Sequence, residues 1–579
     1  MAYLDRREPA VYVDIEDVSY MGETIESGRT VYSVILCDRG PSNQIVNVNS
    51  QEQFHRIFGK PNFLKTSQTH YMVDAALKYT GDVLVTRVVP DDSYWANTAI
   101  QENTVGEIVQ ASFTFTNGLK EVMLQSVDTQ GYSSSTIYAE NDAMAELDKI
   151  QVGSWIYADG DDSSYAAQVV NKVLNEETGV YTLTLDREYN GSSVIGEAFV
   201  FVPFSETSLT NVDSENLLVN PEGNVVYYFY ANGAGKYYNK LCVRGTRNVD
   251  LEKYYIYEDG TPMYKYMFMD LGIYEVQDNG NYKLIEGPWT VSLIPRYPGD
   301  TGQVIDPTTS QYIFIEDVIN DNSNLIRCVA STKDPVTDEV NVEFPSVTKL
   351  IDSEDKRLQV MLMLSTYTPL GTSNIAATST GVSLKNGTDG TGLYNAAGNI
   401  QPSTALLGKV GLAFGGQLTD DEKLTELREQ IYGSILPDYI VAGGFPSEVL
   451  YYANELASWR EDCICLADTG AYYNSPDKDI EARKSQVPWN KWTSALYTQY
   501  RRISDAYTGR KFWISPVYHA IQAHLYCDAT YFLSEPVAGI EKGAIEDPIV
   551  LAYKGTHTTR GDLMDVELNC TIKTSIVDK

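Results

Sequence analysis

The pattern of apolar and polar residues predicts a β-α-β unit over residues 436–466. Two continuous apolar runs, residues 439–442 and 463–466, have the length and composition of buried strands. Between them Gly443-Gly444 permits a sharp turn, and Ser447 is the predicted N-cap of a helix. The helix has one apolar face, made by residues at helical spacing: Val449, Tyr452, Ala453, Leu456 and Trp459. Two such strands joined by an amphipathic helix are typical of a right-handed crossover in a parallel sheet.

The same kind of pattern occurs near the start of the chain. Residues 30–37 and 83–89 are apolar runs that predict strands, and residues 66–80 between them predict a helix. Late segments add further elements, including a helix near residues 490–500 and strands near 512–515 and 549–553. The predicted fold class is therefore an α/β core domain built from both chain ends, with mainly-β domains inserted between them.

Residues 9–20 alternate between apolar and polar side chains, which predicts a strand with no hairpin partner nearby. Such a strand must pair with a distant part of its own fold or with another subunit. The candidate interface strand consists of Val11, Tyr12, Val13, Asp14 and Ile15.

Composition changes along the chain indicate the domain boundaries. Residues 1–20 are expected to form an arm, and residues 21–90 the first part of the core. Residues 91–235 are rich in short alternating runs separated by Asn, Asp, Gly and Ser, which predicts an inserted outer β domain. Residues 236–370 are predicted to form a second β-rich domain, and residues 371–579 the second part of the core.

The net charge limits the kinds of partner. A formal charge of −34 disfavours direct binding to nucleic acid or to anionic membranes, because phosphate groups would be repelled. The 42 Tyr residues suit half-buried strands and interfaces. Seven scattered Cys, without a CxxC pair, are typical of small buried residues in a reducing compartment rather than of a disulfide framework.

Catalytic or metal-binding patterns are weak throughout the sequence. The turn at Gly443-Gly444 lacks the GxGxxG spacing of nucleotide sites and is predicted to be structural. His519 and His524 are five residues apart, which points their rings away from each other on a helix. Residues 159–162 are acidic but lack the pattern of a calcium loop, and Cys463 and Cys465 lie on one face of a buried strand. We therefore expect no enzyme activity, no cofactor and no metal.

Several segments, taken in order, resemble the tail sheath proteins of contractile phages and related injection machines. Pro9-Ala10-Val11-Tyr12-Val13 resembles the N-terminal arm of that family, and residues 58–61 followed by 81–89 resemble its first core segment. Residues 234–239, AGKYYN, stand where the family has a small-residue, aromatic and Asn motif. Gly387-Thr388-Asp389-Gly390 resembles its entry into the second core segment, and residues 462–468 and 512–536 resemble its closing strands and helix.

The resemblance implies a subunit that forms sixfold rings stacked helically around a tail tube, and that contracts to drive the tube through a host envelope. It implies as partners other copies of the chain, the tube protein, and the baseplate and tail terminator proteins. The expected location is a virion tail, assembled in the host bacterial cytoplasm. One departure is that the family continues into a C-terminal arm beyond the position of residues 571–579, so this arm is expected to be missing. The alternative is a virion surface or receptor-binding protein whose Tyr-rich β module binds glycans.

Overall fold

The protein is described by a computed structural model. It covers residues 28–571 except residues 103–106, 126–149, 151–153, 162–164, 176–179, 202–203, 215, 217–223, 256–263, 298–302, 331–349, 352, 366–380, 416–436, 488–491, 532–535, 539–541, 544 and 546–549. The chain divides into two compact units. Unit 1 comprises residues 1–94, 232–236 and 388–579, and unit 2 comprises residues 95–231 and 237–387.

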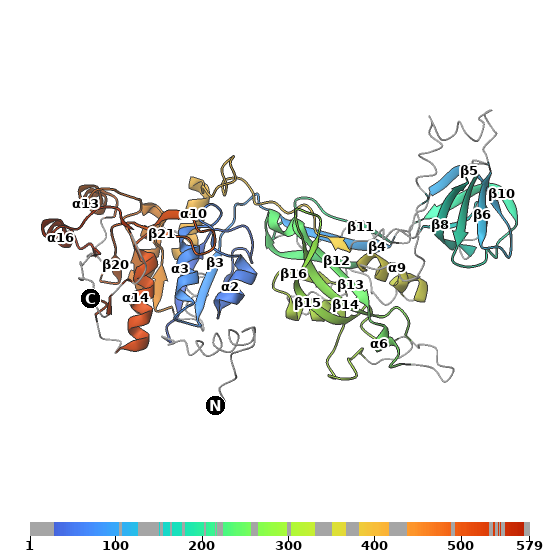
Figure 1. Ribbon diagram of the computed structural model, residues 1–579, viewed down its shortest axis with the longest axis horizontal. Helices are drawn as coiled ribbons and strands as arrows, with labels where there is room; N and C mark the ends of the chain where they lie inside the picture. Colours follow the sequence, from blue (N-terminus) through green and yellow to red (C-terminus); the bar gives the residue numbers. More distant parts are fainter. Residues whose placement is uncertain are drawn as a thin grey trace, which may run out of the picture. The chain divides into compact units, whose positions relative to one another are not determined.

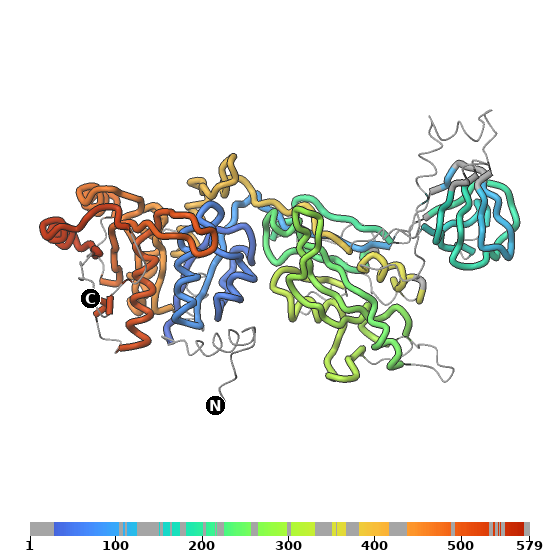
Figure 2. The backbone as a smooth tube through the Cα atoms, viewed as in Figure 1, coloured from blue at the N-terminus to red at the C-terminus, as the bar shows by residue number. Residues whose placement is uncertain are grey.

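Unit 1 is built on a six-stranded sheet to which both parts of the chain contribute. The strand order is β2-β3-β1-β18-β19-β20. The strands are β1 (Val31–Ile35), β2 (Ile45–Val48), β3 (Val83–Arg87), β18 (Tyr439–Val441), β19 (Ile464–Ala467) and β20 (Ser494–Leu496). Strand β1 pairs in parallel with β18, with Val31 opposite Tyr439, so early and late segments lie side by side (Figure 2). The prediction of a mixed α/β domain built from both chain parts is confirmed.

Helices cover both faces of this sheet (Figure 1). One face packs against α2 (Gln51–Phe58), α3 (Gln68–Ala76) and α14 (Val517–Thr530), and the other against α10 (Thr404–Gly415) and α12 (Ser447–Arg460). Successive strand residues serve opposite faces: Tyr32 and Val34 belong to one core cluster, and Val31 and Ile35 to the other. Because both faces are buried, the strands are continuously apolar rather than alternating, as the sequence indicated.

The predicted crossover is present as β18-α12-β19, with β18 and β19 parallel and Tyr439 opposite Ile464. The N-cap prediction was wrong by one residue. Pro446 occupies the cap position and Ser447 is the first helical residue. Proline has no side-chain acceptor, and the Pro446 carbonyl instead accepts from Val449 N at 3.0 Å and Leu450 N at 3.1 Å.

The rest of unit 1 surrounds the late end of the sheet. It contains α13 (Pro476–Ser485), α16 (His557–Met564) and a three-stranded sheet, β22-β21-β23, made by β21 (Arg501–Ser504), β22 (Lys511–Ile514) and β23 (Val550–Leu551). The helix predicted near residues 490–500 was wrong. Residues 494–496 instead form β20, because Cys465 and Leu466 of β19 provide parallel backbone partners for Ser494 and Ala495. Local periodicity does not show such a partner.

Unit 2 contains a closed barrel and two four-stranded sheets. The barrel has the order β10-β5-β6-β9-β8-β7 and is made by β5 (Glu107–Phe115), β6 (Glu121–Gln125), β7 (Trp155–Ala158), β8 (Ala167–Asn175), β9 (Val180–Leu185) and β10 (Val194–Phe201). Inward residues such as Val109, Phe113 and Leu183 fill its interior. A closed barrel has no free strand edge, which protects a small β module from edge pairing.

The two open sheets of unit 2 use strands from its whole length. One has the order β11-β4-β12-β16, made by β4 (Trp95–Glu102), β11 (Phe204–Thr207), β12 (Asn224–Ala234) and β16 (Ile326–Val329). The other has the order β15-β14-β13-β17, made by β13 (Leu241–Arg247), β14 (Phe268–Val276), β15 (Tyr282–Ser292) and β17 (Val382–Ser383). The helices described in this part of the chain are η2 (Lys236–Lys240), α6 (Val249–Glu252), α7 (Ile315–Asn322) and α9 (Glu354–Leu364). The barrel lies between β4 and β11 in the sequence, and these two strands pair with Phe204 opposite Glu102.

Candidate functional site

The carboxyl ends of parallel strands are the usual ligand position of an α/β sheet, and here the chain itself fills that position beside β18. A Cβ atom placed on Gly443 would lie 2.6 Å from Ser515 Oγ and 2.6 Å from Val517 Cβ. Gly444 has a φ of 84°, and a Cβ there would lie 2.7 Å from Gln68 Cβ. Gln68 Oε1 in turn accepts a hydrogen bond from Ser515 N at 2.7 Å. The Gly443-Gly444 turn therefore packs closely on α3 and α14, in agreement with the structural role that its spacing predicted.

Two buried aspartates near this edge bind neighbouring parts of the chain. Asp468 accepts hydrogen bonds from the backbone N–H groups of Gly444 and Gly470, both at 2.8 Å, and from the Tyr500 hydroxyl at 3.1 Å. Burial raises the pKa of Asp468 despite these bonds.

Asp479, in α13, is the second of these aspartates. It accepts from the Thr469 hydroxyl at 2.5 Å and from the Tyr553 hydroxyl at 2.6 Å, and burial raises its pKa too. Every donor identified around the two carboxyls is a neutral group of the same unit. Their arrangement fixes turns and α13, and the sequence analysis did not identify either of them.

Arg87, at the end of β3, connects this strand to two other segments of unit 1, residues 37–42 and residues 232–236. Its side chain is fully buried. Nε donates to Cys37 O at 3.0 Å, and Nη1 lies 2.8 Å from Gly40 O and 2.7 Å from Ala234 O. Nη1 also lies 3.0 Å from Ser42 Oγ. Guanidinium–carbonyl hydrogen bonds of this kind are charge-assisted and therefore strong. Arg87 thus holds residues 232–236 against the early part of the chain.

The segment that Arg87 holds requires small residues. A Cβ on Gly233 would lie 2.1 Å from Gly40 O, and a Cβ on Gly235, whose φ is 150°, would lie 2.6 Å from Asp38 O. The next residue, Lys236, donates its backbone N–H to Asp389 Oδ1 at 2.8 Å. Burial raises the pKa of Asp389, although this hydrogen bond and nearby Arg87 oppose the effect. The motif segments near residues 85, 235 and 389, far apart in sequence, therefore form one connected cluster, which we call the Arg87 cluster.

In unit 2, two hydrogen bonds join the motif segments at residues 234–239 and 387–390. The Asn239 side chain accepts from Gly387 N at 2.7 Å and donates to Gly387 O at 2.8 Å. This reciprocal pair gives the Asn of the AGKYYN motif a specific role, because an amide side chain has both a donor and an acceptor.

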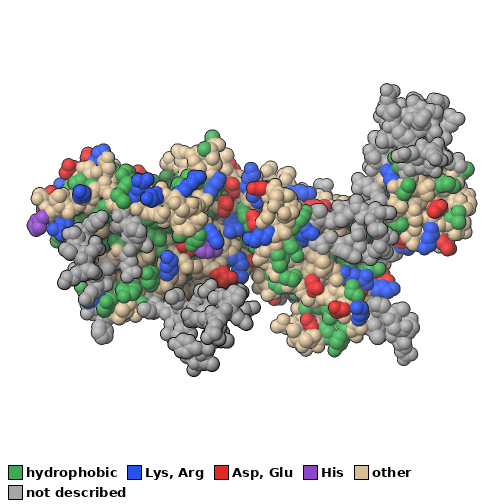
Figure 3. Space-filling model, viewed as in Figure 1, with side chains coloured by type: hydrophobic (Ala, Val, Ile, Leu, Met, Phe, Trp, Pro, Cys, Tyr) green, Lys and Arg blue, Asp and Glu red, His purple; other side chains and the backbone are tan. Residues whose placement is uncertain are grey.

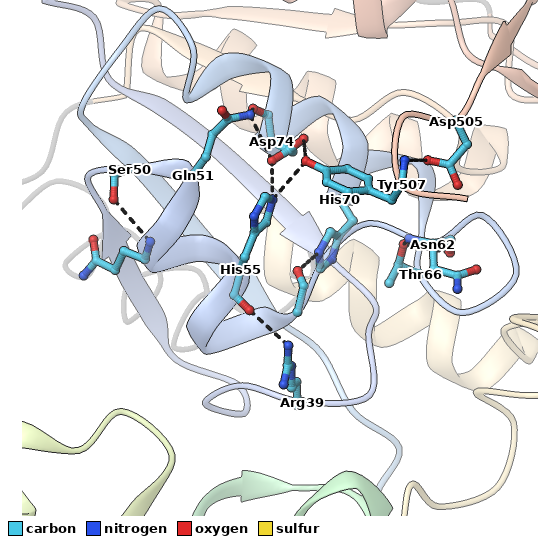
Figure 4. A network of polar contacts seen from close by, with 12 residues as sticks. Arg39, Ser50, Gln51, His55, Asn62, Thr66, His70, Asp74, Asp505 and Tyr507 are labelled. Carbon is cyan, nitrogen blue, oxygen red and sulfur yellow. Dashed lines mark hydrogen bonds and ion pairs between the residues drawn. The ribbon is translucent and has the colours of Figure 1, made fainter. Parts of the chain in front are cut away.

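A polar network joins the early and late parts of unit 1 (Figure 4). His55 Nε2 in α2 lies 2.6 Å from Asp74 Oδ1 in α3, and the Tyr507 hydroxyl donates to Asp74 Oδ2 at 2.8 Å. Burial disfavours the charged form of Asp74, but the hydrogen bonds from His55 and Tyr507 outweigh this effect and lower its pKa. The network fixes the turn after β21 onto α2 and α3.

The structure describes the residues of the weak catalytic and metal-binding patterns, but not those of the candidate interface strand. Val11, Tyr12, Val13, Asp14 and Ile15 lie outside the described residues. His524 lies in α14 with Nε2 2.7 Å from the Tyr497 hydroxyl, and burial lowers its pKa to about 4. His519 is buried on the same helix. Burial raises the pKa of Cys463 to about 12 and raises that of Cys465 further, which suits inert packing residues.

The acidic loop at residues 159–162 is the segment that lacks the sequence pattern of a calcium loop. Asp161 Oδ2 accepts from Ser192 N at 2.9 Å and also binds the Tyr189 hydroxyl. Over the described residues, no group of three or more His, Cys, Asp or Glu side chains is placed to hold a metal ion. Among all the residues that the structure describes, no helix is long and apolar enough to cross a bilayer. On the face shown in Figure 3, basic and acidic side chains are interspersed.

Comparisons with known proteins give a limited result. No protein-family profile matches the chain, and no curated protein sequence matches it significantly. Among solved structures, a sheath tail protein from Listeria innocua aligns with 98% of this chain and 70% of its own, with 9% identity and a TM-score of 0.36. A sheath tail protein from Desulfitobacterium hafniense aligns with 94% of this chain and 69% of its own, with 8% identity and a TM-score of 0.32.

Proposed function

We propose that the chain is a non-catalytic structural subunit of a contractile tail sheath. The Arg87 cluster is the observation that carries the proposal. Segments that resemble the sheath motifs in order along the sequence are joined in unit 1 by direct hydrogen bonds between Arg87, Ala234, Lys236 and Asp389. Chance resemblances in separate segments have no reason to converge on one buried cluster. The filled position at Gly443-Gly444 supports a structural role further.

In this proposal the subunits form sixfold rings that stack helically around a tail tube, and the stack shortens to drive the tube forward. The partners are other copies of the chain, the tube protein, and the baseplate and terminator proteins at the two ends of the tail. The net charge of −34 is consistent with binding to protein rather than to nucleic acid or anionic lipid. The location is the tail of a virion assembled in a bacterial cytoplasm.

Residues 11–15 are proposed as the strand that links one copy to the next. Backbone pairing supplies affinity, and Val11, Val13 and Ile15 give one apolar face. Val13→Pro removes one ladder N–H from every link, whereas Val13→Ile keeps it and serves as the control. We expect Val13→Pro subunits to stay folded, with a thermal midpoint within about 2 °C of wild type, but to form no long tubes.

Electron microscopy and calorimetry of the two variants test this arm. Tubes of ordinary length in Val13→Pro would contradict it. A large fall in the midpoint of the unassembled variant would contradict it as well, because the strand would then belong to the fold of its own subunit.

The barrel of unit 2 is proposed to be an outer decoration that stacking does not require. Because Glu102 and Phe204 are paired neighbours on β4 and β11, residues 103–203 can be replaced by a two-residue Asn-Gly turn without moving either strand. We expect the shortened chain to fold and to assemble. A soluble, folded product that forms no polymers under conditions where wild type does would refute the decoration role.

A further inference from the structure

Arg501 is a buried cation with an incomplete set of partners. It begins β21, the central strand of the β22-β21-β23 sheet, and lies between Ile514 of β22 and Leu551 of β23. Only 4% of the residue is exposed. Nη2 donates to Thr571 Oγ1 at 2.5 Å, whereas Nε and Nη1 have no hydrogen-bond partner among the described residues.

Other buried arginines of unit 1 are better satisfied. Arg87 has four acceptors within 3.0 Å. Arg460 pairs with the Asp462 carboxylate through two bonds, at 2.8 and 2.9 Å. Arg483 donates to Val487 O at 2.5 Å and to the Glu567 carboxylate at 3.1 Å. Arg501 is the exception among these arginines, since its hydrogen-bond partner among the described residues is one threonine hydroxyl.

The electrostatic surroundings of Arg501 fit this description. Burial lowers the pKa of the guanidinium to about 9, and the nearby Tyr497 phenol opposes the shift only weakly. The Tyr497 hydroxyl also contacts His524 Nε2, itself a neutral group at pH 7 because burial lowers its pKa to about 4. A guanidinium held in such surroundings without a carboxylate is costly, and an anion that reaches it removes much of that cost.

Arg501 lies next to the edge strand of its sheet, because the strand order is β22-β21-β23. Among the described residues, β22 pairs with all four residues of β21, and β23 pairs with Arg501 and Arg502. Val550 in β23 is 59% exposed. Among the described residues, β23 and the side chain of Thr571 lie beside Arg501 on this side, at an edge of the sheet that a second copy of the chain can approach.

We propose that Arg501 binds a carboxylate side chain contributed by a second copy of the chain when copies assemble. The proposal rests on the self-assembly proposed above. Charge complementarity identifies the occupant, because each copy carries 78 Asp and Glu residues against 44 Lys and Arg. Copies with a net charge of −34 repel one another, and a cation placed at the contact offsets part of that repulsion. A buried ion pair is also weakly screened by salt, which suits a contact that must persist.

The test compares full-length wild type, Arg501→Met, Arg501→Lys and Arg502→Met. Arg502 is the matched control because it lies next to Arg501 on the exposed face of β21. The thermal midpoint is measured for unassembled subunits, and the critical concentration for assembly is measured by sedimentation. We expect Arg501→Met to leave the subunit midpoint equal or higher, because an unpaired buried charge is removed, and to raise the critical concentration about 30-fold or more. Arg501→Lys is expected to fall between wild type and Arg501→Met, and Arg502→Met to match wild type.

Each other outcome overturns the inference. If wild type assembles and Arg501→Met assembles at the same critical concentration, the carboxylate site is refuted while the proposed function stands. A fall of several degrees in the Arg501→Met subunit midpoint would place the counter-charge within the same chain. If wild type does not associate at any concentration, the inference and the proposed function both fail.

Discussion

Replacement of Arg87 by Met tests whether the Arg87 cluster holds unit 1 together. Methionine has a similar length and no donor, so the substitution keeps most of the packing and removes the contacts to Cys37, Gly40 and Ala234. We expect residues 232–236 to lose their attachment to β3, because Ala234 O accepts a hydrogen bond from the guanidinium at 2.7 Å.

The expected loss of stability follows from the carbonyl groups that no longer receive a hydrogen bond from the guanidinium. Each buried carbonyl that loses its partner costs about 1–3 kcal/mol, and three carbonyls are affected. Removal of the buried charge offsets part of the cost, since the guanidinium no longer has to be desolvated. A net destabilisation of unit 1 of about 3 kcal/mol is therefore expected. For a unit of this size it corresponds to a fall in thermal midpoint on the order of 5 °C.

Differential scanning calorimetry and hydrogen exchange measure this effect. The transition of unit 1 is expected to move while that of unit 2 stays, and amide exchange at residues 232–236 is expected to accelerate in Arg87→Met. Arg502→Met, the same change at an exposed position, is expected to alter stability by less than about 0.5 kcal/mol. An unchanged midpoint together with wild-type exchange at residues 232–236 would refute the role assigned to Arg87.

Two further predictions concern packing and pH. Gly443→Ala is expected to destabilise unit 1 by about 1–3 kcal/mol in urea unfolding, because the added Cβ meets Ser515 and Val517, whereas Gly408→Ala in α10 meets no atom within 4 Å and is expected to stabilise. An equal effect of the two changes would contradict the close packing of the turn. His70 is buried and His524 is half-buried, and desolvation lowers the pKa of each to about 4 from the ordinary 6.5. Their contribution to the free energy of unfolding is therefore complete above pH 6.5. It is lost as the pH falls towards 4, by about 3 kcal/mol for each histidine, because the unfolded chain binds the proton first. Unfolding free energies at pH 7 and pH 4.5 check this, and a His524→Gln variant with the wild-type decline would contradict it.

The sequence predicted the elements whose signal is local. The crossover of β18, α12 and β19, and the early segments β1, α3 and β3, were recognised from apolar runs and helical spacing. Strand β20 differs from the helix predicted near residues 490–500, since its formation depends on pairing with the neighbouring β19 and not on its own periodicity. Helix α9 was also missed, because residues 354–364 lack a clear apolar face.

The Arg87 cluster could not be predicted as a site, because its members come from segments about 150 residues apart. One signal was present nevertheless: Arg87 interrupts the apolar run of residues 83–89, and a charged residue in a strand buried on both faces needs specific partners. The motif order located the right segments, and the hydrogen bonds explain why Gly235 and Asp389 are needed in them. Buried groups such as Asp468 and Arg501 gave no comparable signal, since acidic and basic residues are common in surface loops.

Electron microscopy of the purified full-length protein over a range of concentrations tests the central claim most directly. If the chain is a sheath subunit, the images will show rings or long tubes with regular transverse striations, and their number will rise with protein concentration. Isolated particles of single-subunit size at every concentration would contradict self-assembly. They would favour instead a surface-binding protein that uses its Tyr-rich β module.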